Sequence, residues 1–190
     1  PTIEKLTETI HKKPKLVKES YIKLRSTPMK VTISRVQSLP KTVRREYNRY
    51  GFDGYSNIKH SYELESINGN KVVIDNATGL MWHQSGPQSY MTWHQARRWV
   101  KNLNIKGYAG YHDWRIPTVE EAASLLESGI NNSDLFINPI FSGTQVNIFT
   151  SDKHESSSKT WNVHFDDGYI MSGYVGDSYY HYVRPVRSME

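Results

Sequence analysis

The sequence of 190 residues contains no cysteine and no run of about 18 apolar residues. The absence of cysteine excludes a disulfide framework, thiolate zinc sites, iron–sulfur clusters and cysteine nucleophiles. The absence of a long apolar run excludes a transmembrane helix. The first residues, PTIEKLTETIHKKPK, hold no apolar stretch of signal-peptide length. We therefore expect a cytoplasmic chain as given, and display at the cell surface through a partner or a missing segment stays open.

Motifs of common enzymes and metal sites are also absent. The sequence has no G-x-S-x-G, no G-x-x-x-x-G-K and no G-x-G-x-x-G, so we expect no catalytic activity and no cofactor. Its eight histidines are scattered, without H-x-x-x-H or H-E-x-x-H spacing. Two tripeptides that supply calcium ligands in sugar-binding proteins, E-P-N and Q-P-D, are missing too, although WNV partly matches the W-N-D that accompanies them. We predict no metal site.

Positive charge is concentrated at the front of the chain. The net charge is +5, but Lys and Arg outnumber Asp and Glu by 14 to 5 in residues 1–60 and are outnumbered by 10 to 14 in residues 61–190. The composition therefore predicts a basic, mainly helical N-terminal extension over residues 1–60 and one acidic domain over residues 61–190.

Helical spacing dominates the extension. Apolar residues in 2–25 predict two short amphipathic helices with a break at Pro14. The stretch MKVTISRV predicts a strand or the start of a helix, and residues 41–50 predict a helix that ends at Gly51. The following GFDGYSN is rich in turn residues and predicts a hinge.

The second part combines two helices with strands. Asn68-Gly69 predicts a hairpin, and Thr92 and Thr118 predict helix N-caps, the latter in a T-x-x-E capping box that ends with Glu121. A helix from Thr118 is expected to end at Gly129. Strands are expected at KVVID, LMW, NIFTSD, KTWNVHF, YIMSGYV and YYHYVRPVR. The predicted fold class is α+β, with two helices against an antiparallel sheet that runs from a strand near residue 72 to one near residue 183.

Alternating and aromatic positions predict structural roles. Val163, Phe165, Tyr182 and Val186 should face the core. We expect Asp113 to form a buried ion pair with Arg184 or Arg187, with Trp114 packed nearby. The residues predicted to be structural are Trp82, Asp113, Trp114, Arg115, Trp161, Arg184 and Arg187.

The segment 162–182 has the composition of a recognition surface. Sixteen of its 21 residues are Asn, His, Asp, Gly, Ser or Tyr, which give rigid contact area and adaptable hydrogen bonds. Alternatively, these residues decorate a solvent-facing sheet and its turns. The candidate ligand contacts are Asp166, Asp167, Tyr169, Tyr174, Asp177, Ser178, Tyr179, Tyr180 and His181.

Seven segments, VIDNATGLMW, MTWHQARRWVKNLN, GYHDWRIPTVEEAASLLE, NPIF, FTSD, WNVHFDDGY and YVRPVRS, resemble the Lcl C-terminal domain family in order and spacing. The resemblance covers residues 70–188. It implies a C-type lectin-like fold in which the terminal strands pair, two helices flank them and a small second sheet presents a ligand-binding face. It also implies a binding module without catalysis. Family members include adhesins that bind sulfated polysaccharides, often as trimers, and variable proteins diversified by retroelements near the C-terminus.

Three functions follow from these features. The composition of 162–182 matches the residues reached when adenines in Asn-type codons are randomised, so we expect a retroelement-diversified variable protein that binds a macromolecular ligand, most of all a protein. The first alternative is a polyanion binder for sulfated glycan or nucleic acid, which would use the basic extension through Lys12, Lys13, Lys15, Arg44, Arg45 and Arg49. The second is a structural or assembly domain. A homo-oligomer is compatible with each.

Overall fold

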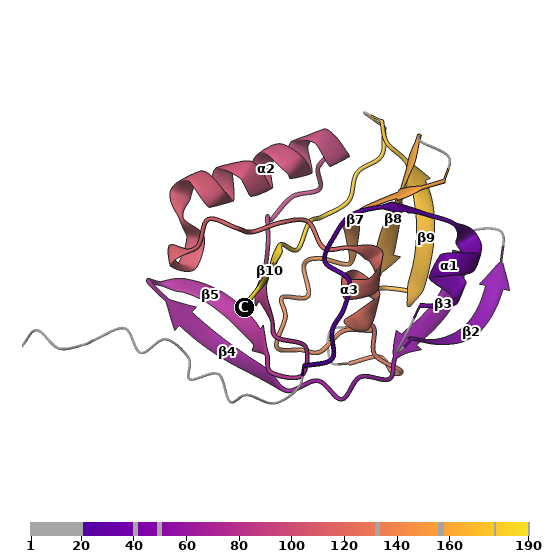
Figure 1. Ribbon diagram of the computed structural model, residues 1–190, viewed down its shortest axis with the longest axis horizontal. Coiled ribbons are helices and arrows are strands. Elements are labelled where there is room, and N and C mark those ends of the chain that lie inside the picture. Colours follow the sequence, from indigo (N-terminus) through magenta and orange to yellow (C-terminus); the bar gives the residue numbers. More distant parts are fainter. Residues whose placement is uncertain are drawn as a thin grey trace, which may run out of the picture.

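Two β-sheets and their covering helices are seen in the computed structural model, which describes residues 21–39, 42–48, 51–131, 134–155, 158–176 and 178–189. The larger sheet has the strand order β1-β7-β8-β9-β3-β2 and the smaller one β10-β6-β5-β4. In Figure 1, α2 and the β4–β5 hairpin lie at one end of the molecule, and β9, β3 and β2 lie at the other. The predicted α+β class is confirmed.

The larger sheet is antiparallel except for the β1–β7 pair. Its strands are β1 (Lys30–Val31), β2 (Thr42–Asn48), β3 (Gly51–Ser56), β7 (Asn147–His154), β8 (Lys159–His164) and β9 (Tyr169–Tyr174). A short helix, α1 (Ile33–Gln37), follows β1. The sheet thus combines strands from the two ends of the sequence.

The smaller sheet is antiparallel throughout. Its strands are β4 (Tyr62–Ile67), β5 (Asn70–Asp75), β6 (Leu80–His83) and β10 (Val186–Ser188). The expected strands near residues 72 and 183 do share a sheet, but β6 lies between them and the last strand begins only at Val186. Pro185 directly before β10 cannot donate a ladder hydrogen bond, which fits this late start.

Three expectations for the N-terminal part are wrong. Residues 42–48 form β2 instead of a helix, GFDGYS forms β3 instead of a hinge, and residues 21–25 are not helical. β3 pairs with β2 on one side and β9 on the other, so the gain from joining a sheet outweighs the helical propensity of Lys, Arg and Glu. The larger sheet therefore crosses the boundary that was predicted at residue 60, and residues 1–20 lie outside the described part.

Local signals are confirmed where they were strongest. Asn68 and Gly69 both have positive φ, 51° and 77°, as a tight two-residue hairpin turn requires. Both helices, α2 (Trp93–Lys106) and α3 (Val119–Ser124), begin with complete capping boxes at Thr92 and Thr118. A single 3₁₀ turn, Tyr108–Gly110, follows α2. α3 ends at Ser124, earlier than the expected Gly129, and MKVTISRV forms β1 and then α1.

The core lies in two layers on either side of the smaller sheet. One cluster joins Val73 and Trp82 to α3 and to the larger sheet, and it includes the expected Val163, Phe165, Tyr182 and Val186. The other joins Val72, Ile74 and Met81 to α2 through its buried Ala96, Val100 and Leu103. No helix among the described residues is both long and apolar enough to cross a membrane.

Candidate ligand-binding face

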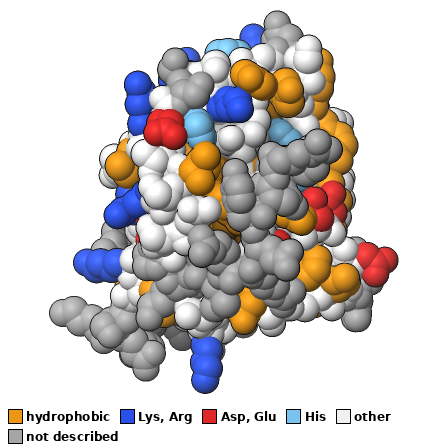
Figure 2. All heavy atoms as spheres, turned by 90° about the vertical axis from the view of Figure 1, so that its right-hand side faces the viewer, with side chains coloured by type: hydrophobic (Ala, Val, Ile, Leu, Met, Phe, Trp, Pro, Cys, Tyr) orange, Lys and Arg blue, Asp and Glu red, His pale blue; other side chains and the backbone are white. Residues whose placement is uncertain are grey.

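One surface collects most of the predicted ligand contacts. We call it the tyrosine face and define it by Tyr90, His164, Asp166, Asp167, Tyr169, Tyr174, Tyr179, Tyr180 and His181. It is built from the β8–β9 hairpin, the segment after β9 and, at Tyr90, the segment before α2. The segment after β9 returns along the sheet until the Tyr182 amide donates a hydrogen bond to the Asn147 carbonyl at the start of β7. Figure 2 views the molecule from the side of β9 and β3, where hydrophobic side chains are interspersed with His, basic and acidic ones.

Two histidines lie together at one end of this face. The rings of His164 and His181 are 5.4 Å apart and nearly perpendicular, and Nδ1 of His181 lies 2.9 Å from Oδ1 of Asn147. Burial lowers the pKa of His181 to about 4, with a smaller effect from His164. Burial also lowers the pKa of His164, although Asp167 and Asp166 oppose that shift. Both imidazoles are therefore neutral at pH 7.

The β8–β9 turn places two carboxylates beside these rings. Oδ1 of Asp166 lies 3.7 Å from Nδ1 of His164, and Asp167 accepts a hydrogen bond of 3.1 Å from the Tyr169 amide. Burial raises the pKa of Asp167, with His164 lowering it and Asp166 adding to the rise. Donor atoms of His164, Asp166 and Asp167 lie within 4.8 Å of one another, so among the described residues this group could hold a cation. From the sequence we predicted no metal site, and this prediction is untested.

Exposed tyrosines make up the other end. The rings of Tyr174 and Tyr179 are 5.9 Å apart, and the ammonium of Lys159 lies 4.7 Å from the centre of the Tyr174 ring. A Cβ at Gly173 would lie 3.0 Å from the side-chain nitrogen of Asn162 on β8, so glycine leaves room for that side chain between the two strands. Tyr174, Tyr179 and the adjacent Tyr180 are 50%, 42% and 52% exposed.

Sequence reasoning missed three residues of this region. Tyr90 comes from the segment before α2, is 48% exposed and contacts Tyr182 with ring centres 4.2 Å apart. Asn147 and His164 come from β7 and β8 and hold the histidine end. An aromatic residue in the polar loop SGPQSY is the one signal that could have indicated Tyr90, whereas the convergence of the other two depends on strand pairing.

The remaining predicted contacts are placed as follows. Ser178 lies in the returning segment, and Asp177 lies outside the described residues. Of the residues predicted to bind polyanions, Lys12, Lys13, Lys15 and Arg49 lie outside the described part, and Arg44 and Arg45 belong to β2, of which only the backbone is described. That prediction stays a prediction.

A second surface, which was not predicted, is the basic side of α2. His94, Arg97, Arg98 and Lys101 are all exposed there and line one depression of about 430 Å³. Arg97 lies with its guanidinium 4.9 Å from the Trp93 ring and also borders a neighbouring groove of about 430 Å³ between α2 and β7. Arg115, Ser151 and Lys153 line the same groove.

A further cavity lies away from both surfaces. It has a volume of about 480 Å³ and is lined by residues of the β3–β4 link and of the chain after α3, among them His60, Tyr62 and Glu127. Both ring nitrogens of His60 are occupied, by Asp75 and by the Ser124 carbonyl, each at 2.7 Å. None of the predicted ligand contacts borders this cavity.

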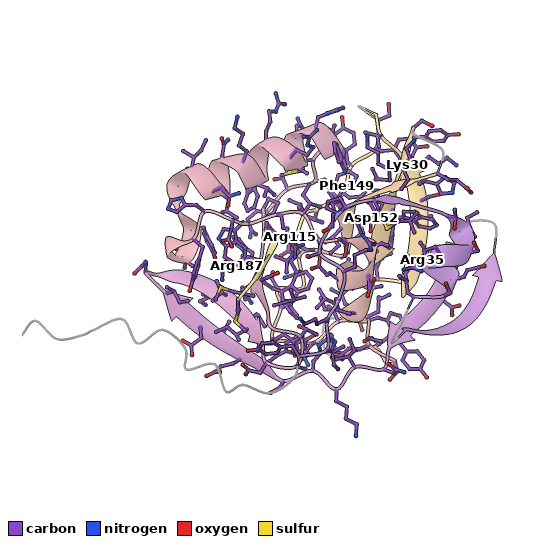
Figure 3. All side chains as sticks on the ribbon, viewed as in Figure 1. Lys30, Arg35, Arg115, Phe149, Asp152 and Arg187 are labelled. Carbon is purple, nitrogen blue, oxygen red and sulfur yellow. The ribbon has the colours of Figure 1, made fainter. Side chains whose placement is uncertain are left out.

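The expected ion pair between Asp113 and an arginine forms with Arg187. Arg187 Nε donates to Asp113 at 2.7 Å and lies over the Tyr111 ring, but the Asp113 side chain is 58% exposed, so the pair is not buried. In the view of Figure 3, Arg115 and Arg187 lie between α2 and the β4–β5 hairpin. Arg115 makes two hydrogen bonds, of 2.7 and 2.6 Å, to Glu121.

Arg184 has a different environment from the one expected. It is completely buried, makes no ion pair among the described residues, and donates to the carbonyls of Gln84 and Ser142 while its guanidinium lies 4.8 Å from the Phe141 ring. Burial lowers the pKa of Arg184 to about 9. The predicted structural tryptophans Trp82, Trp114 and Trp161 are all buried.

Comparison with protein families gives one match. Residues 71–187 match the model of the Lcl C-terminal domain. No curated protein matches the chain. The matched residues begin in β5 and end in β10, so they include the whole tyrosine face and α2 but none of β1, β2 and β3.

Proposed function

The chain belongs to the Lcl C-terminal domain family, and we propose that it is a non-enzymatic binding module whose tyrosine face binds a protein ligand. The observation that carries this proposal is the distribution of exposed tyrosines. Among the described residues the exposed tyrosines are Tyr90, Tyr174, Tyr179 and Tyr180, and all four belong to this face. Tyrosine gives a large contact area with little loss of conformational entropy, which is why it is enriched in protein-binding surfaces.

The proposed fold is C-type lectin-like. Three features support it: β6 pairs with β10 at the end of the chain, α2 and α3 flank the paired strands, and the β8–β9 hairpin carries the tyrosine face on the other sheet. The second sheet is larger than that fold implies, because β3 and β2 extend it beyond β9.

Diversification by a retroelement is part of the proposal. The variable positions would be those of the tyrosine face that come from residues 166–181, where Asp, Ser, Tyr and His predominate. The test is genomic: we expect a reverse transcriptase gene beside this gene, with a near-copy of the segment that encodes residues 160–188 that differs only at adenines. A locus with neither would contradict diversification and leave binding by the face untouched.

A second candidate function is binding of a polyanion, and the basic side of α2 favours it. Arg97, Arg98 and Lys101 are exposed on one side of a single helix, beside the groove that Trp93 and Lys153 border. Sulfate and phosphate groups bind such clusters with an affinity that falls steeply as salt rises. Unlike Lys12, Lys13 and Lys15 of the extension, these residues lie in the described part of the chain, so we test the candidate function on α2.

Binding by the tyrosine face is testable without a known ligand. A random peptide library displayed on phage is selected on the full chain, and the selected peptides are measured against Tyr179→Ala/Tyr180→Ala. We expect that variant to lose at least about tenfold in affinity. Leu64→Ala, which removes an equally exposed side chain from β4, is the control and should bind normally. Peptides that bind Tyr179→Ala/Tyr180→Ala as tightly as they bind Leu64→Ala would contradict the proposal.

A further inference from the structure

The cavity of about 480 Å³ lies between two segments, the chain from the end of β3 to the start of β4 and the chain after α3. In Figure 1 the link from β3 to β4 runs along the bottom of the molecule, below α3. The Ser56 amide donates to the Leu126 carbonyl at 2.8 Å and so joins the two walls. The Glu127 amide donates to the Phe136 carbonyl at 2.9 Å and fixes the second wall. The cavity is therefore preformed, and its volume lies in the range of about 300 to 1,000 Å³ that is usual for small-molecule sites.

Tyr62 has a fixed position in the first wall. Its ring stacks on His60 with ring centres 4.8 Å apart and packs against Phe141, nearly perpendicular, at 5.3 Å. The His60 ring cannot turn, because both of its nitrogens are hydrogen-bonded. Burial raises the pKa of Tyr62 well above its usual value, and the charges of Asp75 and Glu127 add to this rise. The Tyr62 hydroxyl therefore keeps its proton, and it donates to no other described residue.

Two side chains of the second wall also have free hydrogen-bonding capacity. Glu127 is half-buried, and its carboxylate forms no ion pair or hydrogen bond with another described residue. Oδ1 of Asn138 accepts from the Ile140 amide at 3.0 Å, which leaves the NH₂ group of Asn138 as a donor. A half-buried carboxylate without a partner costs free energy, and a cation in the cavity would offset that cost.

These groups match the chemistry of a small primary amine. The Glu127 carboxylate can accept from an ammonium group, in a charge-assisted hydrogen bond about twice as strong as a neutral one. Tyr62 and Asn138 can donate to an acceptor beside that ammonium group, and the buried Ile58 and Leu126 offer apolar contacts. A calcium ion fits less well, because it takes about six to eight oxygen ligands and Glu127 brings the one carboxylate among the described residues of the cavity.

We propose that this cavity binds a small primary amine that carries a carbonyl acceptor next to its amino group, with Glu127 as the counter-charge and Tyr62 and Asn138 as donors. None of the residues that define the tyrosine face or the basic side of α2 borders the cavity, so the inference goes beyond the proposed function and does not depend on it. Because Tyr62 belongs to one wall and Glu127 to the other, a bound amine would link both and stabilise the folded chain.

The probe is L-leucinamide, which has an α-ammonium group, an adjacent amide carbonyl and an apolar side chain. It is titrated into the full chain labelled with nitrogen-15, and binding is followed by the NMR signals of the backbone amides. Signals of residues 56–62 and 126–130 should shift. Two matched compounds are the chemical controls, since N-acetyl-L-leucinamide lacks the ammonium group and 3-methylbutylamine lacks the amide. Each should bind at least about fivefold more weakly, because each loses hydrogen bonds to the cavity.

Variants identify the groups that bind the probe. Glu127→Gln should weaken binding of L-leucinamide at least about tenfold, and Tyr62→Phe about fivefold. Glu63→Gln removes the same charge from exposed β4 and should bind the probe normally. Equal unfolding midpoints without the probe show that each variant folds.

Three results would overturn the inference. They are the absence of any shift with L-leucinamide, shifts confined to other parts of the chain, and binding that Glu127→Gln or acetylation of the amino group leaves unchanged. Each of these results concerns the cavity alone and leaves binding by the tyrosine face untouched.

Discussion

Arg25 and Asp152 form a two-pronged ion pair, with hydrogen bonds of 2.9 and 2.6 Å from the guanidinium to the two carboxylate oxygens. Asp152 is completely buried in β7 and also accepts from the amides of Met29 and Val119, each at 2.8 Å. The Arg25 carbonyl in turn accepts from the Thr118 hydroxyl. One carboxylate thus joins the chain before β1 and the start of α3 to the larger sheet.

Replacing Asp152 should destabilise the protein strongly. Asp152→Asn removes the nearer of the two carboxylates that face Arg25, since Glu120 lies 3.8 Å away, and it provides one acceptor oxygen where four donors need two. Breaking one side of such a buried pair costs about 3 kcal/mol or more. The free energy of unfolding, measured in urea, should fall by that amount for Asp152→Asn and by less than about 0.5 kcal/mol for the exposed Glu63→Gln. A loss as small as the control's would show that the pair does not join these segments.

Arg184 should not be replaceable by lysine. One ammonium group cannot reach the Gln84 and Ser142 carbonyls together, and it lacks the flat guanidinium that lies over Phe141. We expect Arg184→Lys to lower the free energy of unfolding by about 2 kcal/mol, because a buried carbonyl loses its donor. The same substitution at the exposed Arg98 should have little effect. Equal stabilities of the two variants would contradict this role.

Stability should fall as the pH falls from about 7 to about 5. Burial lowers the pKa of His83 to about 3, and Nδ1 of His83 accepts a hydrogen bond of 2.8 Å from the Gly86 amide. His181 has a pKa of about 4 for the same reason. Between these values and 6.5 the unfolded chain binds protons that the folded chain does not, so the folded state loses up to about 1.4 kcal/mol per pH unit for each histidine.

The pH effect is checked by measuring the free energy of unfolding across this range. His83→Asn keeps an acceptor near the Gly86 amide and removes the titrating ring, so its stability should depend less on pH. Leu64→Ala, which removes an exposed side chain without a titrating group from β4, should keep the slope of the unchanged protein. A wild-type stability that stays constant or rises on acidification would show that these histidines are not held neutral.

The basic side of α2 should not contribute to ligand binding by the tyrosine face. Arg97→Glu/Arg98→Glu changes four charge units on α2 but alters none of the residues that define that face. Selected peptides should bind this variant with unchanged affinity at physiological salt. Heparin offers the opposite test: if α2 is a polyanion site, heparin should bind the unchanged chain, and that binding should be lost in this variant and in high salt. Heparin that binds the variant as tightly as the unchanged chain would place the polyanion site away from α2.

Signals within a few residues predicted much of the fold. The capping boxes at Thr92 and Thr118 and the turn at Asn68-Gly69 depend on local hydrogen bonds and local dihedral angles, so the sequence is sufficient for them. The segment 41–50 is the opposite case. Its residues favour a helix locally, and β2 forms because the chain turns back to pair with β3, which itself depends on β9 more than a hundred residues later.

The sequence predicted which segment forms the candidate face, but not which residues from other segments join it. Tyr, Asp and His in residues 166–181 indicated a recognition surface, and the described members of that set do lie along one hairpin and its returning segment. Tyr90 could not be added from the sequence, since its contact with Tyr182 spans 92 positions and depends on the bridge between Met91 and His181. The net charge of residues 61–190 is negative, so it gives no sign of the local cluster of Arg97, Arg98 and Lys101 on α2.

Binding by the tyrosine face is tested most directly by one affinity measurement on a peptide selected against the full chain. The dissociation constant is measured for the unchanged protein, for Tyr179→Ala/Tyr180→Ala and for Arg97→Glu/Arg98→Glu, each in low and in moderate salt. The tyrosine variant should bind at least about tenfold more weakly in both salts, and the arginine variant should bind normally. Normal binding by the tyrosine variant, with loss in the arginine variant and in moderate salt, would contradict the proposal and place the binding site on α2.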